Sequence, residues 1–219
     1  MSKKIETQLL SDENGVKWAP HIGANYFSSP FRILLVGESH YGNPNDSNDL
    51  SNNPDFTKLM VKELGIEKMN YNNIKLFNKI NALLNYNSNE EVWQKIGFYN
   101  FIQEVMPEKT IRPKKEHFVN GWKSFAHVLD ALKPDLCIFI GSEAAKSFEE
   151  SFNNNKDYFI SNLTYGEKIN GTYLRTATID DINKKTTQLI FIKHLSKFAS
   201  VSKWREKILE ISPESKNIL

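Results

Sequence analysis

Two short, almost wholly apolar segments, each ending in a glycine, constrain this chain more than any other feature. They cover residues 31–37 and 136–141 and are rich in branched side chains. Such runs are typical of strands buried on both faces, which occur in parallel sheets covered by helices. Helical periodicity predicts helices over 56–64, over 74–84 and from about Lys115. Such helices are the crossover connections that parallel strands need. The sequence therefore predicts an α/β fold, a three-layer α/β/α sandwich with a mainly parallel central sheet.

The rest of the pattern adds further strands and a last helix. Strands are predicted over 97–102, 172–179 and 187–193, and an amphipathic helix over 200–211. The chain shows no internal repeat and no clear linker, and 219 residues with 40% hydrophobic content are enough for one core. We therefore expect a single domain over residues 1–219, in which residues 1–30 form an N-terminal extension packed on the core.

Charge and cysteine content exclude several classes of protein. The 28 basic and 26 acidic residues leave a net charge of +2, so any DNA-binding surface must be local. Cys137 is the only cysteine, which excludes an internal disulfide and a four-cysteine metal or iron–sulfur site. No segment has the character of a signal peptide or approaches the ~20 apolar residues of a membrane span. We expect a cytoplasmic monomer without membrane contact, metal or cofactor.

Polar side chains gather where the predicted strands end. The clusters are Glu38 to Tyr41, Asn100 with Gln103 and Glu104, Ser142 with Glu143, and His194 with Ser196. In open parallel sheets ligands bind beyond the carboxyl ends of the strands, where loops and helix amino termini converge. A long polar loop over 43–54 follows the first cluster, and loops of that length are often functional. These strand ends are therefore the predicted site.

Structural roles compete with functional ones at each cluster. Ser142 stands where a helix N-cap belongs, and we favour that role for it. For Asn100 a structural role, tying loops together, and a functional role are balanced. For Glu38, His40 and His194 the functional interpretation leads. The chain lacks a phosphate-binding loop, a dinucleotide-binding glycine motif and a zinc-binding helix motif.

In their order along the chain, these clusters resemble the uracil-DNA glycosylase superfamily. The segment from Gly37 to Gly42 looks like its first motif, the water-activating loop, and Asn100 looks like the asparagine that binds the flipped base. His194-Leu195-Ser196 resembles the His-Pro-Ser motif. The matching positions between and after them are Arg112-Pro113 with Glu116, 132–135, 140–144 and Trp204. The resemblance spans roughly Arg32 to Leu209.

The resemblance implies a DNA repair enzyme that hydrolyses the N-glycosidic bond of uracil, or of a related deaminated base, flipped out of single- or double-stranded DNA. Glu38 would stabilise the cationic sugar and orient the water, and His194 would donate a hydrogen bond to the departing base. The remaining expected roles are base binding by Tyr41, Phe56 and Asn100, and DNA-backbone contacts by Ser39, Ser142 and Ser196.

The motifs also depart from the family pattern. Ser39 replaces the aspartate of the best-known branch, so the carboxylate would be Glu38, as in the iron–sulfur branch, whose four cysteines are missing. His40 and Leu195 replace prolines. An alternative is therefore a protein of the same fold that binds a nucleotide or nucleic acid without cleaving it. A more distant one is a hydrolase that uses Ser39 with His194.

Overall fold

The computed structural model describes residues 2–41, 50–67, 75–85, 89–107, 111–152, 156–197 and 199–219. The strands are β1 (His21–Ile22), β2 (Ile33–Tyr41), β3 (Gly97–Met106), β4 (Leu136–Ile140), β5 (Tyr158–Ile160), β6 (Thr164–Ile169), β7 (Thr172–Asp181) and β8 (Thr186–Ile192). The α-helices are α1 (Ser2–Leu9), α2 (Phe56–Met60), α3 (Lys75–Leu84), α4 (Asn89–Trp93), α5 (Lys115–Leu132), α6 (Phe148–Phe152) and α7 (Val201–Ile211). Single turns are η1 (Asp12–Asn14), η2 (Leu50–Asn52), the π-helical η3 (Val61–Ile66), η4 (Ala144–Ser147) and η5 (Pro213–Asn217).

The strands form one mixed sheet, so the prediction of a mainly parallel three-layer sandwich is wrong. The strand order is β1-β3-β2-β4-β8-β7-β5, and β6 also pairs with β7. Three pairings are parallel, among β3, β2, β4 and β8. The other four pairings of the described residues, at the two sides of the sheet, are antiparallel. A parallel centre is therefore flanked by an antiparallel strand on one side and by antiparallel hairpins on the other.

The β6–β7 hairpin explains why the sequence pattern was misleading. Five of the six residues of β6 are exposed, so the strand lacks the alternation that marks a half-buried strand. Its turn is nevertheless encoded, because Ile169 pairs with Thr172 across Asn170-Gly171. Both turn residues have positive φ, 48° and 81°, as a type I′ turn requires. The Asn-Gly pair was the available signal for an antiparallel hairpin.

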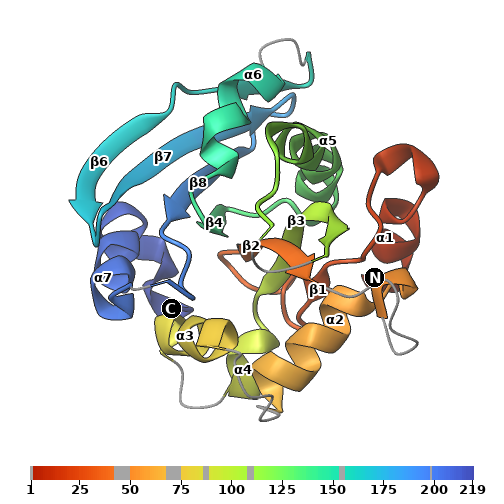
Figure 1. Ribbon diagram of the computed structural model, residues 1–219, viewed down its shortest axis with the longest axis horizontal. Helices are drawn as coiled ribbons and strands as arrows, with labels where there is room; N and C mark the ends of the chain where they lie inside the picture. Colours follow the sequence, from red (N-terminus) through yellow and green to blue (C-terminus); the bar gives the residue numbers. More distant parts are fainter. Residues whose placement is uncertain are drawn as a thin grey trace.

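Apolar side chains form two cores, one on each face of the sheet. One contains buried residues of α5 and α6, and the other contains buried residues of α3, α4 and α7. Figure 1 shows α5 and α6 on one side of the strands and α3 and α4 on the other. The N-terminal segment joins this packing, since Trp18 and Tyr26 are both fully buried. No helix among the described residues is long and apolar enough to cross a membrane.

Several predicted elements are confirmed, with shifted ends. The first core strand was expected to stop at Gly37, but β2 continues to Tyr41. The helix predicted over 56–64 is α2 followed directly by a π-helical turn. Of the loop predicted over 43–54, residues 43–49 lie outside the described residues. The polar motif that follows Gly37 is thus strand, and its side chains are fixed by the sheet.

The hairpin turn offers a test of this topology. Gly171→Ala should lower the free energy of unfolding by about 1 kcal/mol, because an alanine at φ 81° is strained. Gly171→Asn should cost less, since asparagine tolerates positive φ. Urea unfolding of both variants measures the difference. Equal midpoints for wild type and Gly171→Ala would contradict the turn.

Candidate functional site

Three adjacent parallel strands bring the predicted site residues to one edge of the sheet. β2 pairs with β4, and β4 pairs with β8, all in the same direction. Glu38 lies in the last part of β2, Gly141 follows β4, and His194 follows β8. The backbone N–H of Gly141 donates to the carbonyl of Ile192 at 3.1 Å, which holds the ends of β4 and β8 together.

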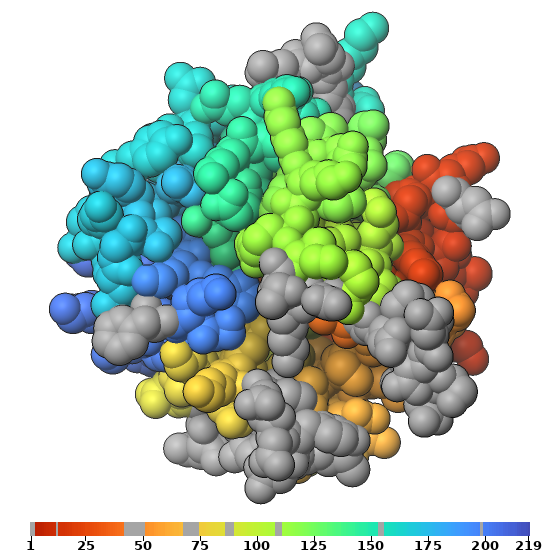
Figure 2. All heavy atoms as spheres, viewed as in Figure 1, coloured from red at the N-terminus to blue at the C-terminus, as the bar shows by residue number. Residues whose placement is uncertain are grey.

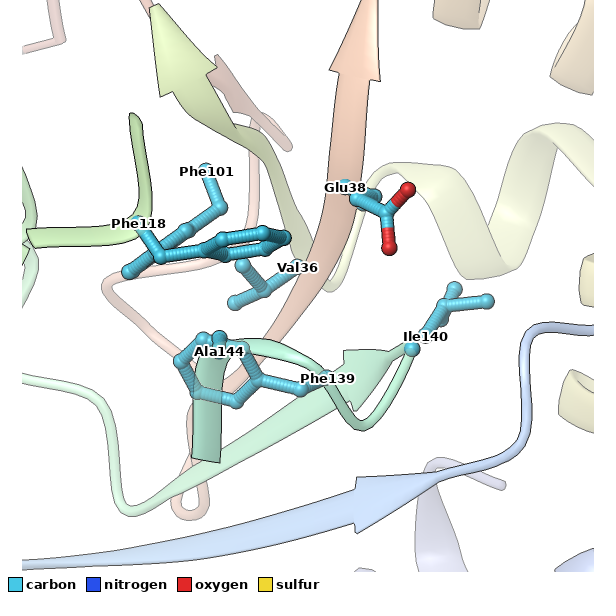
Figure 3. Close-up of a pocket in the computed structure, with 9 residues that line it drawn as sticks. Val36, Glu38, Phe101, Phe118, Phe139, Ile140 and Ala144 are labelled. Carbon is cyan, nitrogen blue, oxygen red and sulfur yellow. The ribbon is translucent and has the colours of Figure 1, made fainter. Parts of the chain in front are cut away.

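Glu38 is a buried carboxylate beside a small cavity. Its side chain is 6% exposed. The cavity, of about 10 Å³, is lined by Glu38, by Gly141 and by the rings of Phe101 and Phe118. Figure 3 shows the carboxylate above Ile140, on the side away from the two rings. A cavity of this size has room for about one water molecule and is too small for a pyrimidine.

Arg112 forms an ion pair with this carboxylate. Its Nη2 donates to Oε2 of Glu38 at 3.0 Å and lies 2.8 Å from Oε1. Oε1 is buried, and its contact with Arg112 is an ion pair. The Arg112 side chain is 51% exposed. The pair therefore links a buried carboxylate to the protein surface, and the same guanidinium nitrogen lies within 3.0 Å of both carboxylate oxygens.

His194 is a neutral hydrogen-bond donor. The backbone N–H of Ser196 donates to Nδ1 at 3.3 Å, and Oγ of Ser196 lies 2.7 Å from the same nitrogen. Because a backbone N–H can only donate, Nδ1 accepts, and the proton of the neutral ring is on Nε2. Burial, with the positive charges of Arg112 and Lys197, lowers the pKa of His194 to about 4. At neutral pH the ring therefore carries its proton on Nε2, as a donor without a charge.

Glu38 and His194 converge on Gly141. A Cβ at this glycine would lie 3.4 Å from Oε2 of Glu38 and 3.8 Å from Cδ2 of His194. The glycine has φ 144°, a conformation that other residues rarely adopt. The two predicted catalytic side chains are thus brought together at one backbone position. A carboxylate and a neutral N–H donor placed in this way can act on two parts of one bound molecule.

A register shift separates His40 from Glu38. Ser39 pairs with Ile102, but His40 pairs with Val105, so β3 contains two extra residues at this step. In a regular strand the side chains at positions 38 and 40 share a face. Here His40 instead contacts Asn100, which lies over Gly37.

The ring of His40 makes the contacts that were predicted for a bound base. It stacks on Phe56 with centroids 4.1 Å apart at 23°, and Trp18 contacts it edge-on at 4.9 Å. The Asn100 amide donates to Nε2 at 2.9 Å, and Oγ1 of Thr57 lies 2.9 Å from the same atom. His40 is 5% exposed, and burial lowers its pKa to about 3. The position between Phe56 and Asn100 is therefore occupied by a side chain of the protein itself.

Of the other predicted site residues, Ser196 contacts His194, whereas Ser39, Tyr41 and Ser142 do not line the cavity. Oγ of Ser39 is buried and has no hydrogen-bond partner among the described residues, and it makes no hydrogen bond with His194. Tyr41 packs against the α5 side of the core and does not line the cavity. Ser142 is not the predicted N-cap, because η4 has Glu143 in that position. Ser196 is exposed beside His194. Their predicted DNA contacts stay predictions.

Two residues at the site were not foreseen as participants. Arg112-Pro113 was noted only as a position that matches the family pattern, without a role, yet Arg112 is the ion-pair partner of Glu38. A cation placed shortly after β3, at the same edge of the sheet, was the signal that could have identified it. Thr57 was hidden in a helical pattern. In the described part of the chain, no group of three or more histidine, cysteine, aspartate or glutamate side chains is placed to hold a metal ion.

The lowered pKa values of His194 and His40 predict how the free energy of unfolding depends on pH. The folded protein binds the protons of His194 and His40 only below about pH 4 and about pH 3, whereas the unfolded chain binds them near pH 6.5. The free energy of unfolding should therefore fall as the pH drops below 6.5, by at most about 1.4 kcal/mol per pH unit for each histidine. Urea titrations of wild type and His194→Asn would show the smaller slope of the variant. Equal slopes would contradict a buried neutral His194.

No protein-family model and no curated protein matches this chain. Its relationship to the uracil-DNA glycosylase superfamily therefore stays a prediction from the motifs. The chemistry of the site has to be inferred from the side chains themselves.

Proposed function

We propose that this protein hydrolyses the N-glycosidic bond of a deaminated base, such as uracil, in DNA. The observation that carries this proposal is the convergence of a buried carboxylate, Glu38, and a neutral imidazole, His194, on Gly141. The resemblance of the motifs to the glycosylase superfamily agrees with it. Each of the two side chains has a separate task in this reaction.

Cleavage of an N-glycosidic bond creates two opposite charges. Negative charge develops on the departing base, and a neutral donor such as Nε2–H of His194 stabilises it without a prior proton transfer. Positive charge develops on the sugar, which is an oxocarbenium ion in character, and the carboxylate of Glu38 stabilises it. A water must then attack the sugar carbon, releasing one proton, so that the products are the free base and an abasic sugar.

The surroundings of Glu38 suit the capture of that water. The adjoining cavity has room for about one water molecule. A water in that cavity would donate a further hydrogen bond to the Glu38 carboxylate, which the Arg112 guanidinium contacts at 2.8 and 3.0 Å. The carboxylate would thereby hold the nucleophile and accept its proton as the new C–O bond forms.

A second candidate function is binding of a nucleotide or nucleic acid without cleavage. Two observations favour it. His40 occupies the place between Phe56 and Asn100 where a base was expected. Arg112 pairs with the carboxylate that the glycosylase reaction needs. Under this alternative, the residues of the site serve recognition, and the glycosidic bond stays intact.

Release of free base separates the two functions. Wild-type protein should release base from an oligonucleotide that contains uracil or hypoxanthine, whereas Glu38→Gln and His194→Asn should each reduce the rate about 100-fold or more. Chromatography of the released base at equal protein concentration measures the rate. Glu206→Gln and His127→Asn, which change exposed residues of the same types, serve as matched controls. No release by wild type, with binding retained, would support the second candidate.

His40 provides a further test of where the base binds. His40→Ala should strengthen binding of a base or lower the KM for base release, because it exposes the ring of Phe56 and the amide of Asn100. It should also lower the free energy of unfolding by about 1–3 kcal/mol, since Asn100 loses a buried partner.

His21→Ala is the matched control for this variant. His21 is also largely buried, with its ring edge-on to Trp93 and Nε2 2.9 Å from the Trp93 carbonyl. Calorimetry and base-release kinetics on both variants should show similar losses of stability, with a change in base binding only for His40→Ala. Weaker base binding by His40→Ala than by His21→Ala would mean that His40 supports the base site instead of occupying its place.

A further inference from the structure

The β6–β7 hairpin exposes two tyrosines and Lys168 on one surface, beside the half-buried Arg175. Tyr165 is 64% exposed and Tyr173 is 47% exposed, and both belong to the few large hydrophobic side chains that the described residues expose. Tyr165 pairs with Arg175 across the hairpin, and Lys168 pairs with Tyr173. Directly paired residues of antiparallel strands share a face, so the four side chains form one cluster. We call it the hairpin patch.

Each cation of the hairpin patch lies over a tyrosine ring. The Lys168 ammonium is 5.4 Å from the ring centroid of Tyr173, and the Arg175 guanidinium carbon is 5.5 Å from that of Tyr165. The two rings are 6.5 Å apart and nearly perpendicular. An exposed ring with a cation beside it offers a stacking surface for a base and a positive charge for the adjoining phosphate.

The hairpin patch carries no compensating negative charge. Neither Lys168 nor Arg175 forms an ion pair with a carboxylate of the described residues. The nearest acidic residue along β6, Glu167, instead forms an ion pair with Lys207 of α7 at 2.6 Å. The near-neutral chain thus has a local positive, aromatic surface, which is complementary to a polyanion with exposed rings.

Hydrogen bonds join this hairpin to the candidate site. Nη1 of Arg175 donates to the carbonyl of Ser142, next to Gly141, at 2.8 Å. The Asn170 turn accepts from Nζ of Lys193 at 2.5 Å and from the backbone N–H of Ser200 at 2.8 Å. Lys193 immediately precedes His194 in the sequence. Figure 2 shows the cyan atoms of the hairpin beside the teal atoms that follow β4 and the blue atoms that follow β8, on one face of the molecule.

We propose that the hairpin patch binds single-stranded nucleic acid, with bases stacked on Tyr165 and Tyr173 and phosphates beside Lys168 and Arg175. A duplex keeps its base faces stacked internally and cannot offer them to the rings, so the patch selects single strands. The inference that the bound strand leads to Glu38 and His194 rests on the proposed function. Binding itself does not depend on cleavage and is measured without it.

The experiment uses a fluorescently labelled oligo(dT), which holds no base that the proposed reaction would remove. The double variant with Tyr165→Ala and Tyr173→Ala should bind more weakly, by about tenfold for each tyrosine lost. The double variant with Tyr165→Phe and Tyr173→Phe should bind like wild type, because the rings remain. Lys168→Gln should reduce the dependence of log K on log salt by about 0.7. Fluorescence anisotropy gives the affinities. Phe159→Ala, which removes a 66% exposed ring on β5, is the matched control and should leave the affinity unchanged.

Further arms of the same experiment decide between the possible occupants. Oligo(dT) and oligo(U) distinguish DNA from RNA, and a duplex of the same length should bind more weakly than either. Equal binding by wild type and the double alanine variant would overturn the proposal, as would an equal loss in Phe159→Ala. A dimer that dissociates when the tyrosines are replaced would identify a second copy of the chain as the occupant and would also overturn it.

The double variant with Tyr165→Leu and Tyr173→Leu, which keeps an apolar surface, should lose affinity like the alanine variant. Failure to release base, with oligo(dT) binding intact, would remove the proposed function and leave this proposal standing.

Discussion

The register shift between β2 and β3 after Ser39 is the constraint on which the whole site depends. It leaves Glu38 on the side of the cavity and turns His40 toward Asn100. Gly37 makes this possible, because a Cβ there would lie 2.2 Å from Oδ1 of Asn100. One of the two extra residues of β3, Gln103, contacts the N-terminal segment. Its side-chain oxygen accepts hydrogen bonds from two backbone N–H groups of that segment at 3.0 and 2.9 Å. A single irregularity thus connects the sheet, the N-terminal segment and the site.

The parallel centre of the sheet was predictable because burial on both faces leaves a strong signal in the sequence. The apolar runs of β2 and β4, and the amphipathic stripe of α5, each identify an element without reference to the rest of the chain. The antiparallel strand β6 gives no such signal. Most of β6 faces solvent, and its place in the sheet is fixed by backbone pairing and by the Asn170-Gly171 turn. Hydrophobic periodicity reports burial, so it cannot report a strand that buries little.

The same distinction applies to the site. Strand-end position correctly grouped Glu38 with His194, because the direction of parallel strands determines which ends meet. Hydrophobic periodicity does not encode the direction of a side chain beyond a strand irregularity, so the stacking of His40 on Phe56 was not predictable from it. Arg112 was missed for a related reason, since a long side chain reaches a partner 74 positions away that no local pattern specifies.

The ion pair at the site limits how any reaction through Glu38 can proceed. Glu38 is buried and fixed in β2, whereas the Arg112 side chain is half exposed, so the arginine is the partner that can leave. Its departure would leave a buried carboxylate without its counter-charge, which is costly unless another positive charge replaces it. In the proposed reaction that charge is the developing cation on the sugar. The released guanidinium would meanwhile lie at the surface, where the phosphate of the same nucleotide is its natural partner. Substrate binding and activation of the carboxylate would then be one exchange of ion pairs.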